Sequence, residues 1–478
     1  MDTTIGLAVS QQKYLPAGAG EKDLHAIVTV EVSGADGAAP GPALAEVLVI
    51  DCSTSMDNPE EKFRAAKNAA IAALRLLPDG TLFAVVAGTH DAVTAYPPQP
   101  AGTPAQACTM AVADATARAE AEAAVHRLVA AGGTCVGNWL HLADLLLARQ
   151  PAPIRHTLML TDGRNEHDDH RPLDGVLTAL AGRFVCDAWG IGAGWDAQVL
   201  LAVTRALHGR ADAVRRESEL VGVYEQLIRA LLVKAVPEVT LTVEPVPGSR
   251  LRYVRQTFPD EVPLTPEADA PGTYVTRAWG NEIRRYHVCV AVDPEGQLHG
   301  EELLAAEVGV RTSDDAGVRL PQAQPLVVNW TDDPALSGVT DEQVLHFQTY
   351  EQLGQAVADA ADAHHRGQLD RAAQLLGQAA ALAHRTGARR QLDELRRLVD
   401  IHDAAAGVVS LRRNIDPVDF QHLITASSQT TYGPAPAGRA ADPGLLPGAA
   451  LTDCPACGRR IPSTAGFCPH CGHALGES

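Results

Sequence analysis

The strongest constraint on the fold is an alternation of short apolar strands with amphipathic helices, which runs from about Ala45 to Val236. Near-continuous apolar strands that alternate with helices are typical of a parallel sheet covered on both faces. Open sheets of this kind bind ligands at the carboxyl ends of their strands. The predicted strands are AEVLVID, TLFAVVAG, IRHTLMLTD and RFVCDAWGIG. The fold class is therefore α/β, with a mostly parallel, doubly wound sheet.

The segments that flank the α/β region have a different pattern of predicted strands and helices. Strands without intervening helices run from Pro237 to about Asp333 between Pro, Gly and Asp turns, which predicts an antiparallel β-sandwich. Residues 341–403 are predicted to be helical throughout, as a small helical hairpin. The predicted division is residues 1–40, N-terminal strands of the sandwich; 41–236, the α/β domain; 237–335, the sandwich; 336–425, a helical region; 426–450, a flexible Pro/Gly/Ala linker; and 451–478, a small separate unit.

Composition narrows the class of partner. The 478 residues carry a net charge of −19, which argues against nucleic acid and anionic membranes because both would be repelled. The chain has no apolar run of about 18 residues and no secretory signal, so we expect a cytoplasmic protein with no membrane partner. Abundant alanine, and arginine in place of lysine, are typical of a high-GC, actinobacterial-like coding bias.

Oxygen-bearing side chains gather where two predicted strands end. Asp51, Ser53 and Ser55 alternate at the end of AEVLVID and in the loop that follows, and Asp162 ends IRHTLMLTD. Thr134 follows a double glycine and precedes a predicted helix. The first three residues alone are equally consistent with a helix N-cap. Because the carboxyl ends of parallel strands share one edge, we expect all five side chains to converge there.

Such a set would supply five oxygens with only two formal charges. All-oxygen ligands suit Mg²⁺, with Mn²⁺ or Ca²⁺ as alternatives. The low charge leaves the cation electron-poor and with a coordination position open. A carboxylate from an Asp or Glu of a partner protein would fill that position.

This arrangement resembles the von Willebrand factor type A (vWA) domain with its metal-ion-dependent adhesion site. The resemblance covers about residues 45–235, and all five family positions match, at Asp51, Ser53, Ser55, Thr134 and Asp162. It implies that the serines and the threonine contact the metal and that the aspartates act directly or through water. Cys52 and Cys135 occupy permissive positions, and we interpret Cys52 as a packing residue.

An enzymatic alternative starts from the same aspartate. A strand that ends in Asp is typical of haloacid-dehalogenase-type phosphatases, in which the carboxylate attacks phosphate. Those enzymes place a second Asp two residues later, where this chain has Ser53. The run NEHDDH at 165–170 looks metal-binding but is better interpreted as a solvated loop on the rim of the site. We predict no catalytic residues and a non-catalytic protein.

The C-terminal cysteines form a second metal motif. Cys454 and Cys457 are separated from Cys468 and Cys471 by ten residues, and each pair has the Cys-x₂-Cys spacing. Two such pairs bind one tetrahedral Zn²⁺ as a zinc ribbon, whose folding energy comes from the metal. We predict a structural or protein-docking module.

The leading functional hypothesis is a scaffold that captures an acidic residue of a partner through the Mg-type site. The domain order resembles vWA proteins that accompany a protein kinase and a PP2C-type phosphatase in signalling modules. Alternatives are an adaptor for a MoxR-type AAA+ ATPase, a metal-dependent phosphatase or hydrolase, and nucleic-acid binding by the ribbon. The predicted linker would expose Ser427, Ser428, Thr430 and Thr431 to a kinase, with Thr430 and Thr431 as the candidate phosphorylation sites.

Overall fold

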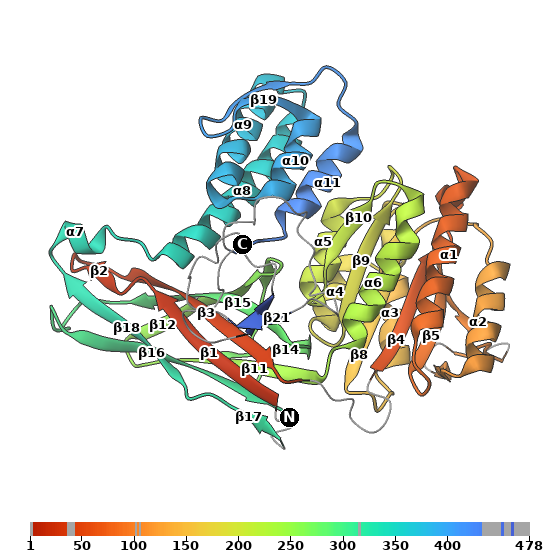
Figure 1. Cartoon of the computed structure of the whole chain (residues 1–478), viewed down its shortest axis with the longest axis horizontal. Coiled ribbons are helices and arrows are strands. Elements are labelled where there is room, and N and C mark those ends of the chain that lie inside the picture. The colour runs from red at the N-terminus through yellow and green to blue at the C-terminus, as the bar shows by residue number, and fades with distance from the viewer. Residues whose placement is uncertain are drawn as a thin grey trace. The chain divides into compact units, whose positions relative to one another are not determined.

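The protein is described by a computed structural model, shown in Figure 1. It describes residues 3–35, 44–100, 103–104, 107–313, 317–432, 451–453 and 460–462. The chain divides into two compact units, Met1–Thr430 and Thr431–Ser478.

The α/β region of the first unit is built on a mostly parallel sheet with strand order β10-β9-β8-β4-β5-β6, to which β7 adds by pairing with β5. The central strand β4 is buried at every position, because helices cover both of its faces. Its parallel neighbours are β5 and β8, so their carboxyl ends meet at one edge. The strands are β4 (Leu44–Asp51), β5 (Leu82–Gly88), β6 (Ala92–Tyr96), β7 (Ala111–Val112), β8 (Ile154–Thr161), β9 (Val185–Ile191) and β10 (Ala211–Val214).

Each face of this sheet packs on its own set of helices, so the predicted doubly wound α/β class is confirmed. Asp114 and Asp196 cap α2 and α5, because each carboxylate accepts a hydrogen bond from a free backbone N–H of the first turn. One face is covered by α1 (Glu60–Leu76), α2 (Ala115–Arg127) and α6 (Leu220–Leu232), and the other by α3 (Val136–Leu147), α4 (Leu173–Leu180) and α5 (Ala197–Ala206). Short 3₁₀ turns are η1 (Thr54–Asp57), η3 (Asp168–His170) and η4 (Glu217–Glu219).

Two mostly antiparallel sheets pack as a sandwich around an apolar core of alternating inward residues. Their strand orders are β13-β12-β15-β3-β1-β17 and β14-β11-β16-β18-β2, so strands from both sides of the α/β region share each sheet. The strands are β1 (Thr3–Gln11), β2 (Tyr14–Pro16), β3 (Lys22–Ser33), β11 (Val236–Pro245), β12 (Ser249–Phe258), β13 (Val262–Pro263), β14 (Thr273–Trp279), β15 (Glu282–Val292), β16 (Glu302–Thr312), β17 (Val318–Arg319) and β18 (Gln324–Thr331).

The helical region shares its hydrophobic core with the α/β region. Apolar residues of α8 to α11 belong to the same buried cluster as those of α3, α4 and α5. Its elements are α7 (Pro334–Ser337), α8 (Glu342–His365), α9 (Leu369–Thr386), α10 (Arg389–Leu398), β19 (Val399–Asp403), β20 (Val408–Leu411) and α11 (Pro417–Ser427).

The prediction of helical structure up to residue 403 is wrong at its end, because β19 pairs with β20 as an antiparallel hairpin. The turn contains Gly407 at φ 68°, a left-handed conformation that favours glycine. The hairpin backbone also packs closely on α9, where a Cβ added to Gly377 would lie 2.3 Å from the Gly407 carbonyl oxygen. Two glycines therefore allow a strand pair where the sequence looks helical.

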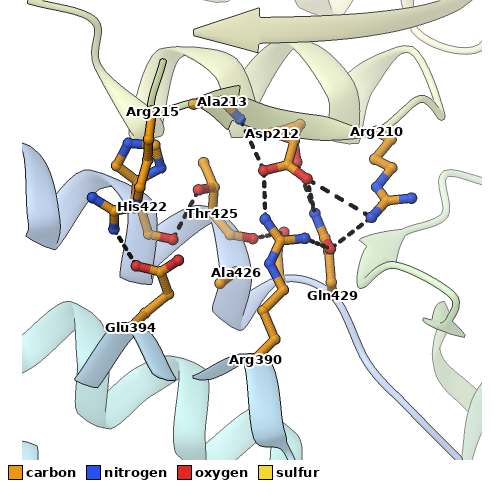
Figure 2. Close-up of polar contacts among 12 residues, drawn as sticks. Arg210, Asp212, Ala213, Arg215, Arg390, Glu394, His422, Thr425, Ala426 and Gln429 are labelled. Carbon is orange, nitrogen blue, oxygen red and sulfur yellow. Dashed lines mark hydrogen bonds and ion pairs between the residues drawn. The ribbon is translucent and has the colours of Figure 1, made fainter. Parts of the chain in front are cut away.

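The expected flexible linker is also wrong for residues 426–430, which form a buried junction (Figure 2). Gln429 lies between β10 and α10, where its side-chain oxygen accepts a hydrogen bond from Arg210 at 2.8 Å and one from Arg390. The hydroxyl of Thr430 donates to the carbonyls of Thr257 and Pro259 in the sandwich segment. These contacts bury Thr430 to 8% exposure, so it is not accessible as expected.

An ion pair beside Gln429 links the helical region to the α/β sheet. The Arg390 guanidinium donates to Asp212 Oδ1 at 2.6 Å, and Arg215 pairs with Glu394 (Figure 2). Arg215 also pairs with Asp419 at 2.7 Å. Burial would raise the pKa of Asp212, but Arg390 and then Arg210 hold that pKa below its ordinary value. The pair therefore stabilises the fold when this carboxyl is ionised.

The second unit contains a short antiparallel pair, β21 (Leu451–Asp453) with β22 (Arg460–Pro462). The four clustered cysteines lie outside the described residues. So does most of the predicted linker, residues 433–450.

Replacing Arg390 with Met should lower the free energy of unfolding by about 2 kcal/mol, because the buried Asp212 carboxylate loses its main charged partner. The control is Arg396→Met, which removes an exposed ion pair on the same helix and should change stability by about 0.5 kcal/mol or less. Urea unfolding measures both. Since the pKa of Asp212 is lowered on folding, the stabilisation is present above the ordinary carboxyl pKa and is lost as the pH falls through the folded-state value. Equal stability of the two variants at neutral pH would contradict this role.

Candidate metal centre

The first wall of the site is the end of β4. Asp51 is fully buried, and its Oδ1 accepts a hydrogen bond of 2.8 Å from the backbone N–H of Ser53. The hydroxyls of Ser53 and Ser55 lie 2.9 Å apart. The loop is held in place because Cys52 N–H donates to the Gly88 carbonyl at 2.7 Å, which ties it to the end of β5. The sequence thus directs three oxygen-bearing side chains to one point.

The second and third walls come from the loop before α3 and from the end of β8. Ser55 donates to Asp162 Oδ1 at 2.7 Å, and Thr161 at the end of β8 donates to Asp51 Oδ2 at 2.6 Å. Thr134 is 3% exposed, and its carbonyl accepts from the His167 N–H at 3.0 Å. Two strands and one loop therefore contribute polar groups to the same place.

Gly163 shows how closely these oxygens converge. A Cβ added there would lie 3.0 Å from Thr134 Oγ1, 3.6 Å from Ser55 Oγ and 3.7 Å from Asp51 Oδ2. Glycine is therefore the residue that leaves space between the three oxygens. Together with the hydrogen bonds of Ser53 and Asp162, this space shows that the structure brings all five predicted residues together.

Lys62, which the sequence analysis missed, completes the electrostatics. Its ammonium group pairs with Asp162 Oδ2 and donates to the Asn58 carbonyl at 2.9 Å, and the residue is only 5% exposed. A lysine in the first turn of a helix opposes the helix dipole, and this was the available signal. Burial raises the pKa of Asp51 to about 6, although hydrogen bonds from Ser53 and Thr161 oppose that rise.

The residues fit a hard divalent cation. Two carboxylates and three hydroxyls are ligands that Mg²⁺, Mn²⁺ and Ca²⁺ accept. Asp162 Oδ2 is buried and, within the described part of the chain, accepts no well-directed hydrogen bond, so its contact with Lys62 is an ion pair. A buried carboxylate oxygen without a directed donor is a suitable ligand for a cation or for a water bound to one.

The run from Asn165 to His170 has a structural role at the rim. Asn165 Oδ1 accepts from the Val136 N–H at 2.9 Å at the start of α3, and Asp168 Oδ1 accepts from Asn165 and from the Leu173 N–H. No group of three or more His, Cys, Asp or Glu side chains that could hold a metal occurs among the described residues. Cys52 is 2% exposed and its burial raises its thiol pKa to about 12, as expected for a packing residue.

Comparisons with known proteins identify the family of the chain. Residues 46–213 match the family model of the von Willebrand factor type A domain. A solved structure described as von Willebrand factor type A from Catenulispora acidiphila is 33% identical, covers 90% of this chain and 98% of its own, and superimposes with a TM-score of 0.80. The chain belongs to the von Willebrand factor type A family, which confirms the predicted family, and metal binding by the five site residues stays a prediction.

Two further relatives are more distant. The ArnB paralog VWA2 from Sulfolobus acidocaldarius is 14% identical over 90% of this chain and all of its own, with a TM-score of 0.52, and shows the fold alone. The protein sll0103 of Synechocystis sp. is 27% identical over 272 residues, which are 55% of this chain. The chain spans 60% of the length of that curated relative.

The C-terminal motif also has a family match, because residues 454–475 match a zinc-ribbon domain. The match includes all four cysteines, Cys454, Cys457, Cys468 and Cys471. Zinc binding by these thiolates stays a prediction.

In the part of the chain that the structure describes, each helix is too short or too polar to cross a bilayer.

Replacing Gly163 with Ala should weaken Mn²⁺ binding by about tenfold or more, because the new methyl group would enter the space between the oxygens. The fold should persist, since Gly163 does not have a positive φ. Gly175→Ala on α4 is the matched control, because its added Cβ meets nothing within 4 Å. Electron paramagnetic resonance of free Mn²⁺ measures the affinity, and circular dichroism checks the fold. Equal affinities of the two variants would contradict the proposed location of the cation.

The ribbon prediction is tested by zinc content. The purified chain should contain one equivalent of zinc, and Cys454→Ser/Cys457→Ser should contain none, because two thiolates do not complete a tetrahedral shell. Cys108→Ser replaces an isolated cysteine outside the motif and should retain the metal. Elemental analysis by mass spectrometry measures the stoichiometry. Zinc retained by the double variant would overturn the ligand assignment.

Proposed function

We propose that this protein is a metal-dependent protein-binding scaffold that captures a carboxylate of a partner through a divalent cation held by Asp51, Ser53, Ser55, Thr134 and Asp162. The observation that carries the proposal is the convergence of three segments around Gly163. Mg²⁺ is the expected ion, with Mn²⁺ or Ca²⁺ as alternatives. The family and fold support an interaction role of this class.

The exposure pattern supports access by a partner. Asp51, Ser53, Thr134 and Asp162 are buried, whereas Thr54 and Ser55 are exposed. The site is therefore enclosed on the protein side and reaches solvent beside Ser55. An Asp or Glu on a protruding loop of a partner could approach the cation from that side.

The charge of the site favours an acidic partner. Two aspartates balance a divalent cation only when no other charge is near, and Lys62 adds a positive charge at Asp162. The metal-bound site would then carry a net positive charge in a poorly solvated position. A partner carboxylate supplies the missing negative charge and a ligand oxygen together.

The identity of the partner stays a prediction. A protein kinase with a PP2C-type phosphatase follows from domain order, and a MoxR-type AAA+ ATPase is the alternative. Accessible hydroxyls at 427–430 no longer support the kinase, because Ser427, Ser428 and Thr430 are buried. Thr431 is the first residue of the second unit and remains the candidate phosphorylation site.

Affinity capture from native lysate tests the proposal with Ser53→Ala/Ser55→Ala against Thr54→Ala. The first variant removes two ligand hydroxyls, and the control removes a neighbouring hydroxyl that instead donates to the Gly132 carbonyl at 2.9 Å. We expect wild type and the control to retain, in magnesium, proteins that the double variant loses. All three proteins are loaded with zinc, and no chelator is used to remove the magnesium, because a chelator would also remove zinc from the ribbon. Identical captured sets for all three proteins would refute metal-mediated capture.

A further inference from the structure

Lys62 is placed as part of the metal centre rather than as a surface charge. It lies in the first turn of α1 and is 5% exposed, with its ammonium against Asp162 Oδ2 and the Asn58 carbonyl. Its alkyl stem is confined by Gly192, where an added Cβ would lie 3.1 Å from Lys62 Cδ. The loop after β9 thus leaves room for the Lys62 stem. Because the stem is confined there, the ammonium stays beside Asp162 and away from bulk water.

The position of this charge changes the electrostatic balance of the centre. Asp51 and Asp162 bring two negative charges, and the three hydroxyl ligands bring none. With Lys62 included, the protein supplies a net charge of −1. A bound divalent cation would raise this to +1, and a partner carboxylate would return it to zero. Without the lysine, the same cation would be neutralised by the protein alone.

We propose that Lys62 is a positioning residue that makes binding of the divalent cation and binding of an acidic partner depend on each other. This inference rests on the proposed function. The ammonium weakens the cation's affinity for the free protein and leaves it a positive charge for an incoming carboxylate. Because such coupling is reciprocal, a carboxylate must raise the affinity for the metal as much as the metal raises the affinity for the carboxylate.

A second consequence concerns the protein without metal. Asp162 is buried, and an isolated buried carboxylate destabilises the fold. Lys62 neutralises it, so the three segments can stay assembled before the cation arrives. The site is therefore preorganised, and partner binding does not have to order it.

The experiment compares Mn²⁺ affinity in sodium acetate and in sodium chloride at equal ionic strength, with acetate as the carboxylate probe. The test variants are Lys62→Met and Lys62→Gln, the second being a polar replacement if the first does not fold. Lys67→Met is the control, because Lys67 lies on the same helix and donates to the Leu128 carbonyl at 2.6 Å, away from the site. Electron paramagnetic resonance gives the affinity, and circular dichroism checks the fold.

We expect acetate to raise the Mn²⁺ affinity of wild type and Lys67→Met several-fold over chloride. Lys62→Met should bind Mn²⁺ about tenfold or more tightly in chloride, because a like charge near the cation is gone, and acetate should then add nothing. Wild-type affinity and a wild-type acetate effect in both Lys62 variants would overturn the inference. Absence of Mn²⁺ binding by wild type beyond that of Gly163→Ala would instead overturn the proposed function.

Discussion

The hydrogen bond from the Thr161 hydroxyl to Asp51 Oδ2 joins the ends of two neighbouring parallel strands, and the candidate site depends on it. It can form because β4 and β8 run side by side in register up to Ile50 and Leu160. The bond fixes one carboxylate oxygen of Asp51 while Ser53 fixes the other. A fully buried acid is thus held in one orientation, and the loop residues that follow each strand are placed around it.

The surroundings of Asp51 explain why the site needs so many supporting contacts. Burial raises the pKa of this carboxyl to about 6, so its ionised form is costly without donors or a cation. The loops that bring Ser55 and Thr134 are tied to the sheet and to each other by backbone hydrogen bonds, such as Thr54 N–H to the Gly132 carbonyl at 2.9 Å. The chain thus arranges hydroxyl oxygens near Asp51, and Asp162 is the one other negative charge among the five predicted ligands. The low negative charge of this ligand set is the property on which recognition of a partner's carboxylate would depend.

Sequence reasoning succeeded where one local pattern determines one structural consequence. Apolar strands alternating with helices indicate a parallel sheet, and oxygen-bearing residues at strand ends are then expected at one edge. It failed where tertiary contacts decide. Lys62 looks like the polar face of a helix, and Thr161 looks like an ordinary strand residue, until the fold brings both to aspartates of the site.

The C-terminal end of the first unit shows the same limit. Ser427, Ser428 and Thr430 have the composition of a linker, yet backbone and side-chain hydrogen bonds bury them between the sheet, α10 and the sandwich segment. Likewise, the local sequence did not predict the hairpin β19–β20, because this hairpin depends on the close approach of the Gly377 and Gly407 backbones. Contacts between residues far apart in the chain leave no periodic trace.

The hydrophobic core common to α3–α5 and α8–α11 has a consequence for modularity. The match to the von Willebrand factor type A model ends at residue 213, which suggests that the α/β region could be expressed alone as an independent module. Cutting there would expose to water the apolar surface of α5 on which Leu423 and the rest of α11 pack. Trp195, in the loop after β9, would also lose the edge of the His422 ring, 5.2 Å away between centroids. The cooperative folding unit is therefore larger than the recognisable domain, and insertion, duplication or transfer of this vWA region between proteins would have to carry the C-terminal helices with it.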